Sequence, residues 1–199
     1  MSKNLLLIFT RNPELGKVKT RLAKSIGNDK ALKVYIELLH QTKRFTENLP
    51  CDKIVYYSEN INCKDIWDLH TYRKELQSGN NLGNRMANAF KQGFSEAYDK
   101  IIIIGSDLYD LTSDIILEAF ERLDSNDVVL GPATDGGYYL LGMKELIPSI
   151  FQNKEWGTPS VFSSTLKDID NKKVFLTKEL NDIDVVTDME NHPVLNSFL

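Results

Sequence analysis

Four consecutive isoleucines, Ile101–Ile104, constrain the fold of this chain more than any other stretch. A segment that is apolar at every position has both faces buried, which is typical of a strand in a parallel sheet with helices on both sides. The β-branched side chains favour a strand over a helix. The run therefore predicts the central strand of an α/β domain.

Strand-like and helix-like segments alternate along the rest of the chain. Further strands are predicted at 5–9, 53–57, 69–76, 127–132, 138–141 and 173–176. Helical periodicity begins near residue 22, resumes after residues 28–29 and continues to Pro50; it is also found from 82 to about 98, from 112 or 113 to 123, and near 161–166. A capping box at 187–190 predicts a last short helix that ends at Pro193. The alternation predicts one α/β domain over residues 1–199, with a mainly parallel sheet and the charged segment 69–76 at or near its edge.

Composition excludes several classes of protein. A net charge of −4 disfavours a nucleic-acid-binding protein, because such proteins carry a basic surface. The apolar run 5–9 is too short for a signal peptide, and no later run approaches the length of a membrane span. Cys51 and Cys63 have no metal-binding spacing and are predicted to be free thiols. We expect a cytoplasmic protein with no membrane partner.

The segment 10–21, between the first strand and the first helix, concentrates positive charge. Its four cations surround Gly16 and are Arg11, Lys17, Lys19 and Arg21. A strand, a basic loop and a helix form an arrangement in which α/β proteins bind phosphate. Lys19-Thr20 resembles the end of a P-loop, but Pro13 and Val18 stand where that motif needs glycine. The loop is thus either a phosphate site built from side chains or a solvated surface loop.

Carboxylates follow the central strand and recur near the C-terminus. Asp107 comes directly after Gly105 and Ser106, where it would lie in the ligand crevice at the carboxyl ends of the strands, and carboxylates there are suited to Mg²⁺ or Mn²⁺. Asp110 is interpreted as a turn or cap residue. Asp182 and Asp184 would share one face of an extended segment, so both could join Asp107 at a metal. Their spacing alone favours a turn.

Other polar groups have structural interpretations. Asp135-Gly136-Gly137 is first of all a hairpin turn, followed by two tyrosines, one for the core and the other for the crevice. Gln77 and Arg85 flank a helix start that Asn80 or Asn81 is expected to cap. The three histidines lie outside every cluster, which argues against a histidine base; they are His40, His70 and His192.

Six motifs in this order resemble one known family. They are Phe9-x-Arg11-x-Pro13-x-x-Gly16-x-x-Lys19-Thr20-Arg21-Leu22, Gln77 with Leu82-Gly83-x-Arg85-Met86, Ile104-Gly105-Ser106-Asp107, Gly131-Pro132-Ala133-x-Asp135-Gly136-Gly137-Tyr138, Trp156-Gly157-Thr158 and Asp182-Ile183-Asp184. The pattern resembles the DUF2064 family of glycosyltransferase-like proteins, which is similar to the phospholactate guanylyltransferases of coenzyme F420 synthesis. The resemblance implies a single-domain GT-A (Rossmann-like) three-layer sandwich with a mainly parallel, mixed central sheet. One departure is Tyr109, where the family has proline.

The resemblance also implies roles for individual residues. The nucleotide-binding set would be Arg11, Gly16, Lys19, Arg21, Gln77, Gly83 and Arg85, with Lys19 and Arg11 on the phosphates. The metal set would be Asp107, Asp182 and Asp184, with Mg²⁺ or Mn²⁺ as cofactor. Lys19 and Asp107 would be catalytic. The acceptor side would be formed by Asp135, Gly136, Gly137 and Tyr138.

These residues predict a metal-dependent transferase of the nucleotidyltransferase or glycosyltransferase type (EC 2.7.7 or 2.4). Its donor would be a nucleotide triphosphate or a nucleotide sugar, and its acceptor a small molecule. The sequence does not separate the two reactions. The alternative is a non-catalytic nucleotide-binding sensor or interaction module on the same fold, which the intact acidic set disfavours because binding alone needs no metal at the leaving group.

Overall fold

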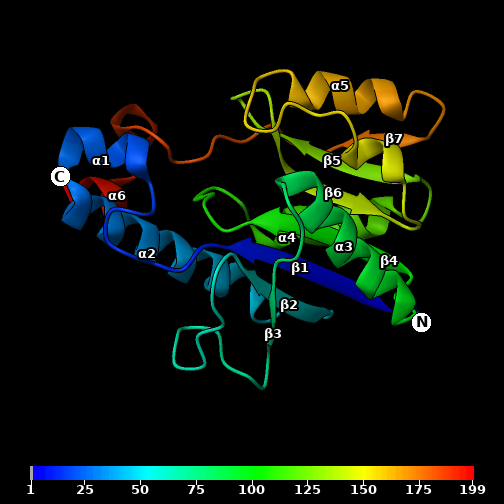
Figure 1. Cartoon of the computed structure of the whole chain (residues 1–199), viewed down its shortest axis with the longest axis horizontal. Helices are drawn as coiled ribbons and strands as arrows, with labels where there is room; N and C mark the ends of the chain where they lie inside the picture. Colours follow the sequence, from blue (N-terminus) through cyan, green and yellow to red (C-terminus); the bar gives the residue numbers. More distant parts are fainter. Residues whose placement is uncertain (1) are drawn as a thin grey trace.

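The computed structural model describes residues 2–199 and arranges seven strands in one sheet, with helices on both faces (Figure 1). In chain order the elements are β1 (Asn4–Thr10), α1 (Thr20–Ile26), α2 (Asn28–Thr46), β2 (Asp52–Tyr57), β3 (Arg73–Leu76), α3 (Leu82–Ser95), β4 (Lys100–Gly105), α4 (Ser113–Arg122), β5 (Val128–Pro132), β6 (Tyr138–Met143), the 3₁₀ helix η1 (Pro148–Phe151), α5 (Val161–Asp168), β7 (Val174–Leu176), the 3₁₀ helix η2 (Val186–Met189) and α6 (Pro193–Asn196).

The sheet is mixed but mainly parallel, as the sequence predicts. Its strand order is β3-β2-β1-β4-β6-β5-β7. Within residues 2–199, β6 is the one strand that runs antiparallel to its neighbours β4 and β5. The isoleucine run forms most of β4, which pairs with β1 in parallel on one side and with β6 on the other. The central-strand prediction is therefore confirmed.

Alternate residues of the central strand pack into two separate cores. Ile102 and Ile104 face the core formed with α2 and α4. Ile101 and Ile103 face the core formed with α3 and η1. All four are at most 4% exposed, and burying each stabilises the fold by about 1.5–3 kcal/mol. Two cores on opposite faces confirm the three-layer arrangement.

The end of the chain returns to its beginning. After β7 the chain crosses to the side of the molecule where α1 and α2 lie, and ends there in η2 and α6 (Figure 1, orange to red). A third apolar cluster, which includes Leu22 of α1, Met189 of η2 and Leu195 of α6, holds these elements together. The crossing segment contains residues 181–185, and it brings them to the carboxyl edge of the sheet.

Two local predictions differ from the structure. Pro193 begins α6 rather than ending a helix, because proline lacks the N–H that the first helical turn leaves unbonded. The segment 69–76 forms a strand only over Arg73–Leu76, at the sheet edge. The break expected near residues 28–29 is found at Gly27, whose φ of 84° separates α1 from α2. Asn81 does cap α3, accepting a hydrogen bond from the Asn84 N–H.

No helix within residues 2–199 combines the length and the apolar character needed to cross a lipid bilayer.

Candidate functional site

The candidate site lies where the direction of the strand order changes. From β1 the chain proceeds to β2 and β3 on one side, and then crosses to β4 on the other side of β1. Such a point opens a crevice at the carboxyl ends of the two strands. A cavity of about 730 Å³ is found there. It is lined by the loop after β1, the start of α1, the loop after β4, two side chains of α3, and residues 182 and 184.

Lys19 connects the basic loop to the acidic residues. Its side chain is only 5% exposed, and its Nζ lies 3.1 Å from Oδ2 of Asp107 and 3.0 Å from Oδ1 of Asp184. Burial opposes a charge on this amine, but the two carboxylates outweigh burial and hold the pKa of Lys19 above its usual value. Lys19 therefore stays a cation.

The backbone of Lys19 is left-handed, with φ 45° and ψ 46°. This conformation costs a non-glycine residue on the order of 1–3 kcal/mol, and such strain is concentrated at functional sites. It directs the side chain toward the carboxylates at the first residue before α1. Sequence reasoning selected Lys19 for its charge and had no signal for its backbone conformation.

Three carboxylates converge beside Lys19. One oxygen from each of Asp107, Asp182 and Asp184 lies within 4.8 Å of the others. The Ile183 N–H donates to the Asp107 carbonyl oxygen at 3.3 Å, which joins the C-terminal segment to the loop after β4. Asp182 and Asp184 thus reach Asp107, although their spacing alone favoured a turn. Asp110 lies outside this group and faces His192 at 3.6 Å.

The pKa values of Asp182 and Asp107 are shifted in opposite directions. Burial and then the charges of Asp107 and Asp184 raise the pKa of Asp182 to about 6. Burial acts on Asp107 too, but the Lys19 ammonium outweighs it and holds the pKa of Asp107 below its usual value. A cluster of hard carboxylate oxygens that repel one another is suited to a hard divalent cation. The donor set therefore fits Mg²⁺ or Mn²⁺.

Two arginines of the basic loop lie in different environments. The Arg21 guanidinium is 3.1 Å from Oδ2 of Asp184 and is 67% exposed, so this pair contributes little to stability. Arg11 lines the cavity and forms no ion pair with any carboxylate in residues 2–199. An unpaired guanidinium next to a cavity can bind a phosphate or carboxylate through two parallel hydrogen bonds.

Buried hydroxyl groups fix the backbone of Arg11. The Tyr35 hydroxyl accepts from the Arg11 N–H at 2.9 Å and donates to its carbonyl oxygen at 3.1 Å. Ser106 donates to the Thr10 hydroxyl at 3.1 Å, which joins the ends of β4 and β1. Sequence reasoning did not select Tyr35 or Thr10. The position of Thr10 at the end of a strand could have indicated its role, whereas the sequence places Tyr35 only on the apolar face of α2.

Gln77 and Arg85 form a second wall of the cavity. The Gln77 amide donates to the carbonyl oxygens of Thr10 and Tyr56 at 3.2 and 3.0 Å. Arg85 donates to Oε1 of Gln77 and to the carbonyl oxygen of Gly79, each at 3.2 Å. Both side chains are therefore held in fixed orientations at the cavity. They flank the start of α3, as the sequence predicts, and their role in nucleotide binding stays a prediction.

Two predicted glycines do not line the cavity. Gly16 adopts a φ of 75°, which explains why the loop needs glycine there. Gly83 packs against Trp156 and the Phe151 carbonyl oxygen, and an added Cβ would lie 2.6 Å from that oxygen. The structure thus gives Gly83 a packing role, and its nucleotide contact stays a prediction. Lys17 does line the cavity, but its exposed ammonium pairs with Glu14 at 2.7 Å.

The predicted acceptor residues form the β5–β6 hairpin, as expected for Asp135-Gly136-Gly137. Asp135 accepts from the Gly137 N–H at 2.8 Å, and its charge helps to raise the pKa of Asp182. Gly136, with a φ of 87°, packs directly against Pro159. None of these residues, nor Tyr138, lines the cavity, so their acceptor role stays a prediction.

The tyrosines after the turn have opposite environments. Tyr139 is buried and its hydroxyl contacts that of Thr177 at 2.8 Å. Tyr138 packs edge-on against Trp156, and its buried hydroxyl has no hydrogen-bond partner among residues 2–199. Burial raises the pKa of Tyr138. Tyr139 is thus the core tyrosine of the pair.

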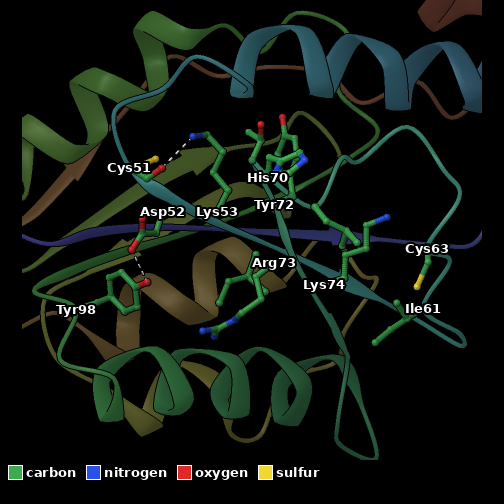
Figure 2. A pocket seen from close by; sticks show the side chains of 13 residues that line it. Cys51, Asp52, Lys53, Ile61, Cys63, His70, Tyr72, Arg73, Lys74 and Tyr98 are labelled. Atoms are coloured by element: carbon green, nitrogen blue, oxygen red, sulfur yellow. Dashed lines mark hydrogen bonds between the residues drawn. The ribbon is translucent and has the colours of Figure 1, made fainter.

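A second hollow, of about 800 Å³, lies along β2 and β3 (Figure 2). It is lined by both cysteines and by His70, but its charged groups already have partners. Tyr98 donates to Asp52 at 2.6 Å, Lys53 donates to two carbonyl oxygens, and Lys74 pairs with Asp65 at 2.6 Å. This hollow offers no unpaired charge comparable to Arg11.

Sequence comparison assigns most of the chain to one family model. Residues 41–158, more than half of the chain, match the family described as "Uncharacterized protein conserved in bacteria (DUF2064)". The matched segment includes Asp107, whereas Lys19, Asp182 and Asp184 lie outside it. No protein of curated function matches the sequence.

Solved structures share the fold over the full length of the chain. A provisionally assigned nucleotide-diphospho-sugar transferase from Desulfovibrio desulfuricans G20 is 29% identical, with a TM-score of 0.88 over 100% of this chain and 94% of that one. The 4-diphosphocytidyl-2C-methyl-D-erythritol synthase from Anaerococcus prevotii DSM 20548 is 14% identical, with a TM-score of 0.61 over 98% and 99%. A cytidylyltransferase from Leptospira borgpetersenii serovar Hardjo-bovis (strain JB197) is 15% identical, with a TM-score of 0.60 over 100% and 88%. The predicted fold is confirmed.

Proposed function

The chain belongs to the DUF2064 family, and from this premise we propose that it is a metal-dependent transferase that moves a group from a nucleotide donor to a small-molecule acceptor. The observation that carries the proposal is the placement of the Lys19 ammonium between Asp107 and Asp184, at the wall of a cavity that Arg11 also lines. The transferases among the structures of the same fold support it.

The basic residues would bind the phosphates of the donor. Arg11 is unpaired and fixed at its backbone by Tyr35, so it can bind a phosphate without losing an existing ion pair. Arg21 and Lys17 line the same cavity and add positive charge. Gln77 and Arg85, on the adjoining wall, would contact the base and ribose.

The acidic residues would hold the cofactor. Asp107, Asp182 and Asp184 would bind Mg²⁺ or Mn²⁺, whose charge stabilises the donor phosphates and the leaving group. Lys19 neutralises part of the negative charge of these carboxylates and orients them through its two short contacts. Asp182, with a pKa of about 6, must lose its proton before it can serve as a ligand.

Catalysis would depend on positioning and electrostatics. The residues that line the cavity include neither cysteine nor histidine, which argues against a covalent intermediate on either type of side chain. In nucleotidyl transfer, an acceptor phosphate or carboxylate attacks the α-phosphorus and pyrophosphate leaves. In glycosyl transfer, the acceptor attacks the anomeric carbon and a nucleoside diphosphate leaves. In both, Lys19 and Arg11 would stabilise the charge that develops on the departing oxygens.

The test is calorimetric titration of the chain with ATP, CTP, GTP, UTP and UDP-sugars, with and without Mg²⁺, followed by product analysis across phosphate, carboxylate and sugar acceptors. We expect Mg²⁺-dependent binding of one nucleotide and formation of pyrophosphate or nucleoside diphosphate. Mg²⁺-dependent binding without any product would favour a nucleotide sensor. Failure of every nucleotide to bind would refute the proposal.

A further inference from the structure

Asp188, which does not line the cavity, organises the segment that carries two of the three clustered carboxylates. Its Oδ2 accepts from the backbone N–H groups of Asp184 and Val185, each at 2.8 Å. Its Oδ1 accepts from the side-chain amide of Asn181, also at 2.8 Å. One half-buried carboxylate in η2 thus bonds to three positions within residues 181–185.

We propose that Asp188 is a positioning residue that holds Asp182 and Asp184 against Asp107 and Lys19. This inference rests on the proposed function, because it concerns the geometry of the proposed metal ligands. Asp188 does not line the cavity, so it would act through the loop.

The loop needs such an anchor because it has no regular structure of its own. Residues 181–185 lie outside every helix and strand, between β7 and η2. Leu180 forms an isolated bridge with Ala133, and the Ile183 N–H bonds to Asp107. Repulsion among Asp107, Asp182 and Asp184 acts to separate the loop from β4. Charge-assisted hydrogen bonds to Asp188 oppose that separation.

Asn181 extends the network to the β5–β6 hairpin. Its side-chain oxygen accepts from the Thr134 hydroxyl, next to Asp135 in the predicted acceptor loop. The chain Thr134–Asn181–Asp188 therefore fixes the acidic segment to two elements at once. Its hydrogen-bond directions are defined, because a carboxylate can only accept, whereas an amide has one donor end and one acceptor end.

These directions allow a test by exchange of side chains. In Asn181→Asp two carboxylates face each other, and the bond between positions 181 and 188 is lost. In the double variant Asn181→Asp with Asp188→Asn, the new asparagine donates to the new aspartate and accepts from the Asp184 and Val185 amides. Asp188→Asn alone can keep these hydrogen bonds if the side-chain amide of Asn181 rotates by half a turn. The Asn181 oxygen then accepts from the amide at position 188, and the Asn181 amide donates to the Thr134 hydroxyl, which can accept as well as donate.

The experiment measures two properties of the full-length protein. Hydrogen exchange of the Asp184 and Val185 amides is measured without metal, and Mn²⁺ binding is measured by the electron paramagnetic resonance signal of free Mn²⁺. For Asp188→Ala we expect exchange at both amides to rise at least tenfold and Mn²⁺ affinity to fall about 10–100-fold, as for other residues that orient metal ligands. Glu190→Ala, which removes an exposed charge from the same segment, should change neither.

The other variants test the proposal even if Asp188→Ala does not fold. We expect Asn181→Asp to weaken Mn²⁺ binding, and both Asp188→Asn and the double variant to bind within about threefold of the parent. The proposal is overturned if Asp188→Ala leaves exchange and Mn²⁺ affinity unchanged, or if the double variant binds no better than Asn181→Asp. A parent that binds no Mn²⁺ would instead refute the proposed metal site, and amide exchange would still report whether Asp188 anchors the loop.

Discussion

The Nζ atom of Lys19 lies 3.0 Å from Oδ1 of Asp184, although 165 positions separate the two residues in the sequence. The contact joins a basic loop near the N-terminus to an acidic segment near the C-terminus. It forms because β1 and β4 end at the same edge of the sheet and the chain crosses back to that edge after β7. Neither segment provides both charges by itself.

Removal of the Lys19 charge should destabilise the metal-free protein. Lys19→Met leaves the three carboxylates without their shared cation. Breaking a buried ion pair costs about 3–5 kcal/mol, but Asp107 and Asp184 are more than 30% exposed, so we expect a loss of about 1–3 kcal/mol. Chemical denaturation at pH 7 measures this loss, and Mg²⁺ should recover part of it. Lys24→Met, at an exposed position of α1, is the control. Equal stability of the two variants would contradict the prediction.

Mn²⁺ affinity should fall as the pH drops through about 6, where Asp182 gains a proton. In the metal-free protein, the folded state binds more protons at Asp182 than the unfolded chain does between pH 3.8 and about 6. The contribution of this group to stability therefore decreases as the pH rises through that window. Carbon-13 NMR titration of the Asp182 carboxyl measures its pKa directly. Asp107→Asn should lower that pKa, and Asp110→Asn should not.

Loss of the Tyr35 hydroxyl should weaken both the fold and the site. Tyr35→Phe removes the acceptor of the Arg11 N–H and should cost about 1–3 kcal/mol of stability. Nucleotide affinity should also fall, because the backbone of Arg11 is released. Tyr98→Phe is a matched control, since its hydroxyl donates to Asp52 far from the cavity. If both variants bind nucleotide equally well, Tyr35 has no role in the site.

Replacement of Arg85 by lysine keeps the charge but removes the planar donor group. Lysine cannot bond to Gly79 and Gln77 as arginine does, so the Gln77 amide loses one of its fixed contacts. We expect nucleotide affinity to fall about tenfold, which corresponds to about 1.4 kcal/mol. Titration calorimetry measures the change. Arg122→Lys, on the exposed face of α4, should bind like the parent. If Arg85→Lys binds the nucleotide as tightly as the parent, Arg85 has no role in nucleotide binding.

Much of the fold is predictable because it depends on local patterns. The isoleucine run, the alternation of strands and helices, and the Asp135-Gly136-Gly137 turn each carry their own signal. The start of α6 at Pro193 is harder to predict, because proline is found both just after a helix and in its first turn, where its missing N–H does no harm.

The candidate site is predictable only in part. Asp107 stands out because it follows the central strand. Asp182 and Asp184 reach Asp107 because of the path of the crossing segment and the hydrogen bonds of Asp188. Neither of these can be predicted from a local sequence pattern. The left-handed backbone of Lys19 and the hydrogen bonds of Tyr35 arise from packing between elements that are distant in the sequence.

The central claim is that the basic loop and the acidic cluster form one nucleotide and metal site. The most direct measurement is the dissociation constant of the best-bound nucleotide triphosphate, with and without Mg²⁺, in the parent and in Asp107→Asn. Asp110→Asn, an acidic neighbour outside the cluster, is the control. We predict that Mg²⁺ tightens binding at least tenfold in the parent and in Asp110→Asn, and less than twofold in Asp107→Asn. Equal tightening by Mg²⁺ in all three proteins would contradict the account.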